Sequence, residues 1–198
     1  MINKNPYDLF KEFVFLDNTV LKGVLPSEIF LELLDMVEQT KRIKEHPLAY
    51  LKTHRNYGKN SYQTSINTNL LNDSFTFPYI NYLGEYYIHK LLNKPIDALY
   101  RGLRVRENRG HFDGYDVWVN YGYKGDINPM HNHAGTLSGN IYIKNDYQVP
   151  TRFMSGVEHK GIPGDIIIFP SDLKHEVEEL KEDQERITIA FNLDGFYS

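Results

Sequence analysis

Cysteine is absent from the 198 residues of this chain. Without thiols the chain can form neither a disulfide framework nor a zinc–thiolate site, so any metal ion must be held by nitrogen and oxygen ligands. Long apolar runs are also missing. No stretch approaches the roughly 20 apolar residues that a membrane-spanning helix needs, and the first residues lack the apolar segment of a signal peptide. We therefore expect a soluble, cytoplasmic protein with no membrane partner.

Neither sign of charge dominates the composition. The chain carries 26 acidic and 22 basic side chains, a net charge of -4, which gives no electrostatic reason to expect nucleic acid as a partner. Its length suffices for one well-filled core. We expect a single domain, residues 1–198, in which residues 1–96 form a mostly helical and looped elaboration and residues 97–198 form a β-rich core.

Helical spacing appears only in the first half. Phe30, Leu33, Leu34 and Val37 recur with the helical period after Pro26, which predicts an amphipathic helix, and a second helix is predicted over residues 78–94. The polar, turn-rich residues 52–68 predict a long loop between the two helices. Because this loop is basic and contains tyrosines, it is a candidate for a lid that faces the substrate.

The second half changes to short runs of β-branched and aromatic residues separated by turn residues. These runs predict strands over residues 98–106, 115–123, 137–144, 165–169, 175–180 and 186–192. Successive strands without intervening helices favour a sandwich or jelly roll over a doubly wound sheet.

Two of these strands have informative patterns. The apolar run of residues 166–169 predicts a strand buried on both faces. Residues 186–192 alternate, so one face should carry the three apolar side chains and the other should carry Arg186, Thr188 and Asn192. By the same alternation, Trp118 and Asn120 should share one face of their strand.

Histidines supply the most specific pattern. His131 and His133 are two residues apart, which places both side chains on one side of a strand, and His175 follows the buried strand and could close a metal site against them. A catalytic iron needs few protein ligands and several open positions, usually from two histidines and a carboxylate, and three histidines can substitute. Taken alone, a His-x-His pair is more often a surface or hydrogen-bonding pair.

Arg186 lies eleven residues after His175 and adds a second element to this pattern. A planar guanidinium binds a carboxylate through two parallel hydrogen bonds, so this arginine could fix a cosubstrate. The alternative is a strand-end arginine paired with Glu176 or Glu178. Histidines and arginine together favour an iron oxygenase.

Seven short motifs in order resemble the 2-oxoglutarate- and Fe(II)-dependent oxygenases, in particular a group common in phage and marine bacterial genomes. The likeness covers roughly residues 115–193, and its motifs are Trp118-Val-Asn120, Gly125-Asp126, His131-Asn-His133, residues 137–144, Pro163-Gly164-Asp165 with the strand after it, His175-Glu-Val177 and residues 186–192. The resemblance implies a double-stranded β-helix, cupin-like fold, bound Fe(II), and hydroxylation of a substrate while 2-oxoglutarate becomes succinate and CO2.

The resemblance also implies roles for individual residues. His131 and His175 become iron ligands, and Arg186 becomes the partner of the distal carboxylate of 2-oxoglutarate. Lesser contacts with this cosubstrate are expected from Tyr142, Ser138 and Thr188. Asn120 is expected to lie outside the set of metal ligands and to help fix the orientation of a residue that contacts them.

His133 departs from the family pattern, which has an aspartate or glutamate at this position. Three readings stay open: a three-histidine iron site, which the spacing favours; a site completed by Asp126 or another acid; and a shifted register in which His133 is the first ligand and Gly135 stands where the carboxylate is absent.

Two other functions fit parts of the pattern. A cupin-type three-histidine dioxygenase would not use 2-oxoglutarate; Gly125 and the five residues before His-x-His match the start of a cupin signature, but its glutamate is missing. A non-catalytic jelly-roll module, for binding or for a phage structure, would share the fold alone. The sequence identifies neither the substrate, whether small molecule or protein, nor the oligomeric state.

Overall fold

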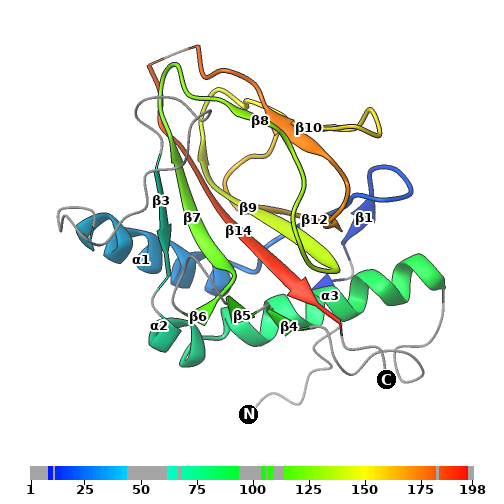
Figure 1. Cartoon of the computed structure of the whole chain (residues 1–198). Helices are drawn as coiled ribbons and strands as arrows, with labels where there is room; N and C mark the ends of the chain where they lie inside the picture. The colour runs from blue at the N-terminus through cyan, green and yellow to red at the C-terminus, as the bar shows by residue number, and fades with distance from the viewer. Residues whose placement is uncertain are drawn as a thin grey trace.

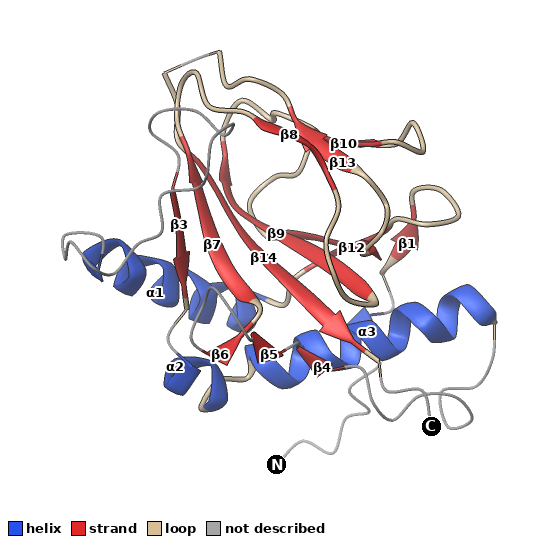
Figure 2. Cartoon of the chain, viewed as in Figure 1, coloured by secondary structure: helices blue, strands red, loops and turns tan. Residues whose placement is uncertain are grey.

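The computed structural model describes residues 9–10, 12–43, 62–66, 68–93, 104–105, 107–108, 114–181 and 183–195. Two antiparallel sheets face each other, and two long helices cover the outer face of the larger sheet (Figures 1 and 2). This mainly β arrangement with N-terminal helices is the jelly-roll fold expected from the strand pattern.

The larger sheet has the strand order β1-β2-β12-β9-β14-β7-β3, with β4 also paired to β14. Its strands are β1 (Val14–Phe15), β2 (Leu21–Val24), β3 (Tyr62–Ser65), β4 (Arg104–Val105), β7 (Val117–Gly122), β9 (Leu137–Asn145), β12 (Asp165–Pro170) and β14 (Arg186–Asp194). The smaller sheet has the order β11-β10-β13-β8, from β8 (Asn128–His131), β10 (Thr151–Phe153), β11 (Glu158–His159) and β13 (His175–Val177). A separate pair joins β5 (Glu107–Asn108) to β6 (Gly114–Tyr115).

The helices are α1 (Ser27–Ile43), α2 (Thr68–Asn72) and α3 (Thr76–Leu92). Both long helices were predicted, although α3 begins two residues before the predicted start and ends two residues before the predicted end. The described helices offer no segment with the length and apolar character needed to cross a membrane.

Two apolar clusters hold the layers together. The larger one lies between the helices and the large sheet and includes the three apolar side chains of β14 predicted to share a face: Ile187, Ile189 and Phe191. The smaller one lies between the two sheets and contains Val20, Tyr142, Phe153, Ile167 and Phe169. All residues from Ile166 to Phe169 are buried, as the uninterrupted apolar run predicts. The second face of β14 is therefore directed into the space between the sheets.

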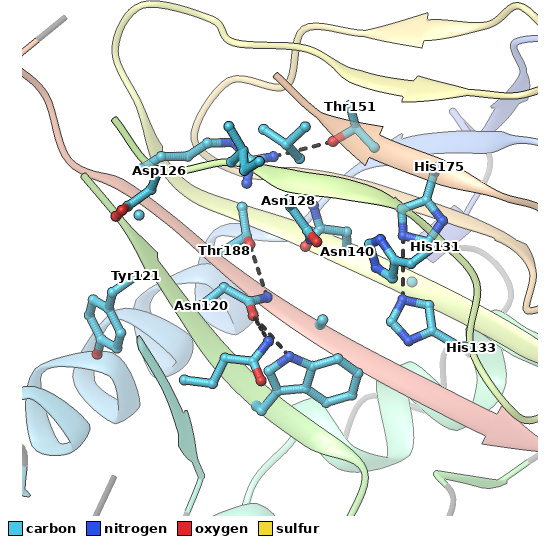
Figure 3. Close-up of a pocket in the computed structure, with 18 of the residues that line it drawn as sticks. Asn120, Tyr121, Asp126, Asn128, His131, His133, Asn140, Thr151, His175 and Thr188 are labelled. Carbon is cyan, nitrogen blue, oxygen red and sulfur yellow. Dashed lines mark hydrogen bonds between the residues drawn. The ribbon is translucent and has the colours of Figure 1, made fainter. Parts of the chain in front are cut away.

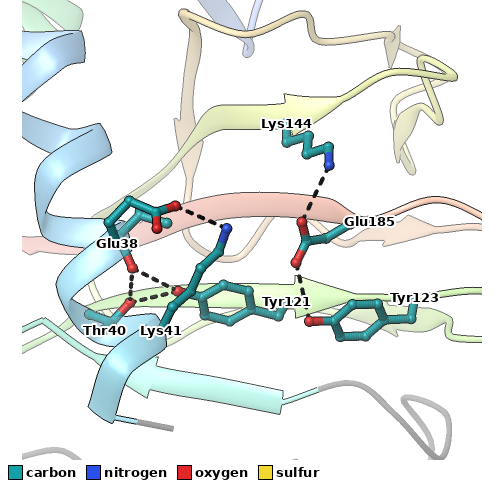
Figure 4. A network of polar contacts seen from close by, with 8 residues as sticks. Glu38, Thr40, Lys41, Tyr121, Tyr123, Lys144 and Glu185 are labelled. Carbon is teal, nitrogen blue, oxygen red and sulfur yellow. Dashed lines mark hydrogen bonds and ion pairs between the residues drawn. The ribbon is translucent and has the colours of Figure 1, made fainter.

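Polar contacts also fix α1 to the large sheet (Figure 4). The Tyr121 hydroxyl on β7 lies 2.6 Å from the Thr40 hydroxyl and donates to the Val37 carbonyl at 3.2 Å. On the neighbouring part of the sheet, Glu185 accepts from Tyr123 and Lys144. These contacts help to hold the sheet that carries the candidate site in a fixed position against its helical support.

The first half of the chain contributes more strand than its sequence predicts. The expected loop over residues 52–68 contains β3, which pairs with β7, and α2 begins at its last residue; residues 52–61 and 67 lie outside the described residues, so the proposed lid is not described. Of the predicted strand over residues 98–106, the structure describes residues 104–105, which form β4; residues 98–103 and 106 lie outside the described residues. Because β2 pairs with β12 and β3 with β7, the N-terminal residues extend the β core as well as covering it.

Candidate functional site

His131 and His175 meet across the small sheet. His131 is the last residue of β8, His175 is the first residue of β13, and the two are direct partners in the antiparallel register. Directly opposed residues project to the same face of a sheet, so both imidazoles enter the space between the two sheets. Their ring centroids are 4.4 Å apart.

His133 reaches the same place by a different route. It lies beyond the end of β8, so alternation along a strand, on which its prediction rested, does not position it. Instead, its backbone N–H donates to the Ser171 carbonyl at 2.9 Å, and its ring lies 5.7 Å from that of Trp118. The expected grouping of His131, His133 and His175 is present, but the strand argument for His133 was wrong.

The three imidazoles point toward one another (Figure 3). One nitrogen from each lies within 4.8 Å of the others, and the Nε2 atoms of His133 and His175 are 3.3 Å apart. The Nδ1 atoms of His131 and His175 lie 2.8 Å and 3.1 Å from the carbonyl oxygens of Pro129 and Leu173. When Nδ1–H donates to a backbone carbonyl, Nε2 is left as a lone-pair donor, the usual arrangement of a metal-binding histidine.

Burial keeps these imidazoles uncharged. Loss of solvent, together with the smaller effects of the neighbouring His175 and His131, lowers the pKa of His133 to about 3. Burial and His131 lower the pKa of His175 to about 4, and burial also lowers the pKa of His131. At neutral pH the cluster therefore offers three nitrogen lone pairs and no positive charge, a donor set that suits Fe(II) and similar cations.

The cluster opens into a cavity of about 370 Å³ between the sheets. Arg186 of β14 lines the same cavity and is only 7% exposed. Its Nη2 donates to the Thr151 hydroxyl at 3.2 Å, and its guanidinium lies 5.4 Å from the centre of the Tyr142 ring.

Arg186 has no anionic partner among the described residues. Its buried Nε has no hydrogen-bond acceptor, and burial lowers its pKa by penalising the charged form. Glu178, one of its conceivable partners, pairs with Arg152 instead. A buried cation without a counter-ion is costly, so this position favours an anion supplied from outside the chain.

The small sheet links the hydrogen-bond partner of the arginine to the histidines. Thr151, which accepts from Arg186, lies two residues before Phe153, and Phe153 pairs with His175. Two strand residues span about 7 Å. A small ligand with a chelating group at one end and a carboxylate at the other could therefore meet both groups within the same cavity.

The residues expected to contact 2-oxoglutarate divide into two sets. Thr188 lines the cavity beside Arg186. Tyr142 and Ser138 are buried and absent from the cavity wall: the Tyr142 hydroxyl lies 2.7 Å from that of Thr151, and the Ser138 hydroxyl donates to the Asn192 side-chain carbonyl at 2.6 Å. Tyr142 thus supports the arginine from behind, and Ser138 belongs to a separate network.

Asn120 and Asp126 also have defined places. The Asn120 side-chain oxygen accepts from Gln63 at 2.7 Å and from Trp118 at 2.9 Å, and Trp118 and Asn120 share the cavity face of β7 as alternation predicts. Asp126 is 3% exposed, and its carboxylate accepts the Tyr123 backbone N–H at 2.8 Å. It closes a turn and lies away from the three histidines (Figure 3), so this structure does not add it to them as a ligand.

Sequence reasoning missed several polar residues of the cavity, among them Asp116, Thr151, Asn128 and Asn140. Thr151 and Asn128 lie on short strands, β10 and β8, which have too few residues to show a period. Asn140 could have been found, because alternation along β9 places it on the same face as Ser138 and Tyr142.

Comparison with known proteins agrees with the fold and with part of the motif pattern. Residues 148–192 match the model of a family described as "Putative 2OG-Fe(II) oxygenase". The matched segment includes His175 and Arg186 but not His131 and His133, so it confirms the resemblance over a shorter range than the motifs covered. No curated protein matches the chain.

Solved structures with similar folds include several oxygenases. A prolyl-4-hydroxylase from Pseudomonas putida has a TM-score of 0.58 and 15% identity over 97% of each chain. A prolyl hydroxylase from Trichoplax adhaerens, in complex with a peptide fragment of the hypoxia-inducible factor oxygen degradation domain, has a TM-score of 0.55 and 13% identity over 96% of this chain and 87% of that chain. The dioxygenase for auxin oxidation 1 from Arabidopsis thaliana, with 2-oxoglutarate bound, has a TM-score of 0.59 and 13% identity over 89% of this chain and 84% of that chain.

Proposed function

We propose that this protein is an Fe(II)- and 2-oxoglutarate-dependent dioxygenase that hydroxylates a substrate while 2-oxoglutarate is converted to succinate and CO2. One observation carries the proposal: a single cavity presents three neutral imidazoles and a buried arginine that has no anionic partner among the described residues. The family match over residues 148–192 supports the same conclusion.

His131, His133 and His175 would hold Fe(II) through their Nε2 atoms. The Nδ1 contacts of His131 and His175 with backbone carbonyls fix the orientation of both rings before a metal arrives. Three protein ligands leave coordination positions open for other molecules. When bound, the iron supplies the activation of dioxygen for oxidation of the substrate.

Arg186 would bind the distal carboxylate of 2-oxoglutarate. Thr151 accepts one of its N–H groups and Tyr142 lies against its guanidinium, so the side chain is held in one orientation while its remaining donors stay available. Thr188, two residues along β14, lines the cavity on the same side as Arg186 and is placed for a weaker polar contact, and Asn140 lines the same cavity. Such fixed positioning of the cosubstrate lowers the entropic cost of reaching the reactive geometry.

Both small molecules and protein segments are candidate substrates. Proteins of similar fold include prolyl hydroxylases and an auxin dioxygenase, so the fold accommodates either class. Besides the histidines and the arginine, the cavity wall includes the neutral polar or aromatic side chains of Gln63, Trp118 and Asn120 and the acidic side chains of Asp116 and Asp126.

The deciding experiment is anaerobic titration of the metal-free protein with Fe(II) and then with 2-oxoglutarate. We expect a visible charge-transfer absorption when the keto acid chelates the bound iron, and formation of succinate when air is admitted. Arg186→Ala should bind iron but lose the absorption at moderate 2-oxoglutarate concentration, whereas Lys181→Ala, which removes an exposed cation, should behave as the wild type.

Two outcomes would overturn the proposal. Failure of the wild-type protein to bind Fe(II) would remove the metal site altogether. Iron binding without any effect of 2-oxoglutarate would instead favour the cupin-type dioxygenase, which needs no keto acid.

A further inference from the structure

A row of hydrogen-bonded side chains crosses the large sheet, and its first member, Asp116, lines the cavity. It starts at Asp116, just before β7, continues through Asn192 on β14 and Ser138 on β9, and ends at Ser171, just after β12. These strands are neighbours in the order β12-β9-β14-β7, and Asn192 and Ser138 are direct partners in the register. The row therefore links four adjacent strands at one level of the sheet.

The row has a single hydrogen-bond direction. Asn192 Nδ2 donates to the Asp116 carboxylate at 3.0 Å, and the Ser138 hydroxyl donates to Asn192 Oδ1 at 2.6 Å. The Ser138 proton is then committed, so the contact of 2.9 Å with Ser171 must use the Ser171 hydroxyl as donor. Because every donor points toward Asp116, the carboxylate polarises the whole row.

Ser171 connects this row to His133. The Ser171 carbonyl accepts the His133 backbone N–H at 2.9 Å, and the Ser171 N–H donates to the Thr136 carbonyl at 3.2 Å. The loop that carries His133 is therefore attached to Ser171 on both sides of Gly135. Burial shields these contacts from water, since Ser171 is 1% exposed, Ser138 2% and Asn192 5%.

The row also brings a negative charge to the cavity through Asp116. At position 133 the chain has an imidazole, where the resemblance leads us to expect a carboxylate, so the three-histidine site lacks one negative charge near the metal. Asp116 lines the same cavity, and its carboxylate accepts a hydrogen bond from a neutral amide rather than from a cation. Its charge is therefore not neutralised within the row.

We propose that Asp116, acting through Asn192, Ser138 and Ser171, positions His133 and supplies from outside the ligand set the negative charge that a carboxylate at position 133 would bring to the metal. This inference rests on the proposed function, because it assumes that the histidines hold a divalent cation. Asp116 is a positioning residue in this account and does not contact the metal.

The test measures metal binding without turnover. Metal-free protein is titrated with Co(II), whose visible spectrum reports the ligand geometry, in the absence of 2-oxoglutarate. Asp116→Asn keeps an acceptor for Asn192 but removes the charge, and we expect about a 10-fold loss of Co(II) affinity, within the range of about 10- to 100-fold seen for groups that support metal ligands. Glu179→Gln removes an exposed acid and should leave the affinity unchanged.

A second variant separates position from charge. Ser138→Ala interrupts the row while Asp116 stays charged, so it should alter the Co(II) spectrum through a displaced His133 and weaken binding less than Asp116→Asn. Thermal unfolding of each metal-free variant establishes that it is folded before titration.

The decisive measurement introduces Asp116→Asn into a protein that already carries His133→Asp. Once a carboxylate is restored at position 133, Asp116→Asn should no longer weaken Co(II) binding. An equal penalty in both backgrounds, or wild-type affinity in Asp116→Asn alone, would overturn the inference and leave the proposed function intact. Absence of Co(II) and Fe(II) binding in the wild-type protein would instead overturn the proposed function and the inference with it.

Discussion

The histidine part and the arginine part of the cavity present opposite electrostatic conditions. His131, His133 and His175 are donors without charge, because burial lowers all three pKa values and neighbouring histidines lower those of His133 and His175 as well. Arg186 is a charge without a counter-ion, because no acidic side chain of the described residues reaches it. The first arrangement favours a cation and the second an anion. The comparison teaches that the two parts are complementary halves of one site for a metal chelate.

Removal of a histidine should have the largest effect, because it removes a ligand from the part of the cavity that binds the metal. His175→Ala and His131→Ala each delete a lone pair directed at the metal, so both should lose more Fe(II) affinity than the about 10- to 100-fold typical of supporting residues. Equilibrium dialysis against Fe(II) under anaerobic conditions measures this directly. Iron retained in His131→Ala but lost in His133→Asp would contradict the assignment and favour the shifted register.

Removal of the arginine should weaken the binding of 2-oxoglutarate and leave the binding of Fe(II) unchanged. Arg186→Ala should weaken 2-oxoglutarate binding by about 100-fold, or about 3 kcal/mol, because a buried charge pair is lost, while Fe(II) affinity stays at the wild-type value. Arg186→Lys should fall between the two, since an ammonium cannot make two parallel hydrogen bonds to a carboxylate. Titration of the charge-transfer absorption with 2-oxoglutarate at saturating Fe(II) gives the cosubstrate constant, and equilibrium dialysis gives the Fe(II) constant. Equal losses for iron and 2-oxoglutarate would show that the two halves are not separable.

The same contrast explains what the sequence could predict. Arg186 and Thr188 were placed correctly because β14 is long and alternates, so its period is readable from one segment. His133 reaches the cluster through a backbone hydrogen bond to Ser171, a contact between distant segments that no local period contains. Thr151, Asn128 and the row from Asp116 to Ser171 were missed for the same reason. Local pattern identifies the strands and their faces, whereas pairing between strands decides which polar residues meet.

Acidic pH should lower the free energy of unfolding of the metal-free protein, because the buried histidines must become protonated. The pKa values of about 3 for His133 and about 4 for His175 lie below the value of about 6.5 in the unfolded chain, so the unfolded chain binds more protons between these limits. The contribution of these two neutral histidines to the free energy of unfolding is fully present above about pH 6.5. It falls as the pH drops toward 4, by about 1.4 kcal/mol per pH unit for each histidine. Urea unfolding in chelator at several pH values should show a smaller slope for His133→Ala. An unchanged slope would mean that this imidazole is protonated in the folded protein.

Removal of the buried arginine charge should have the smallest effect on stability, and it should stabilise the metal-free protein. In the metal-free protein the buried Arg186 guanidinium has lost its hydration without gaining an anion, so Arg186→Met should raise stability by about 1–2 kcal/mol. A gain of this size raises the melting temperature by about 2–4 °C for each kcal/mol in a chain of this length. With Fe(II) saturating in both proteins, 2-oxoglutarate at about 100 times its wild-type dissociation constant should stabilise the wild type by about a further 2.7 kcal/mol and the variant much less, so the order of melting temperatures should reverse. A variant less stable than the wild type without ligands would show that Arg186 is already compensated within the chain.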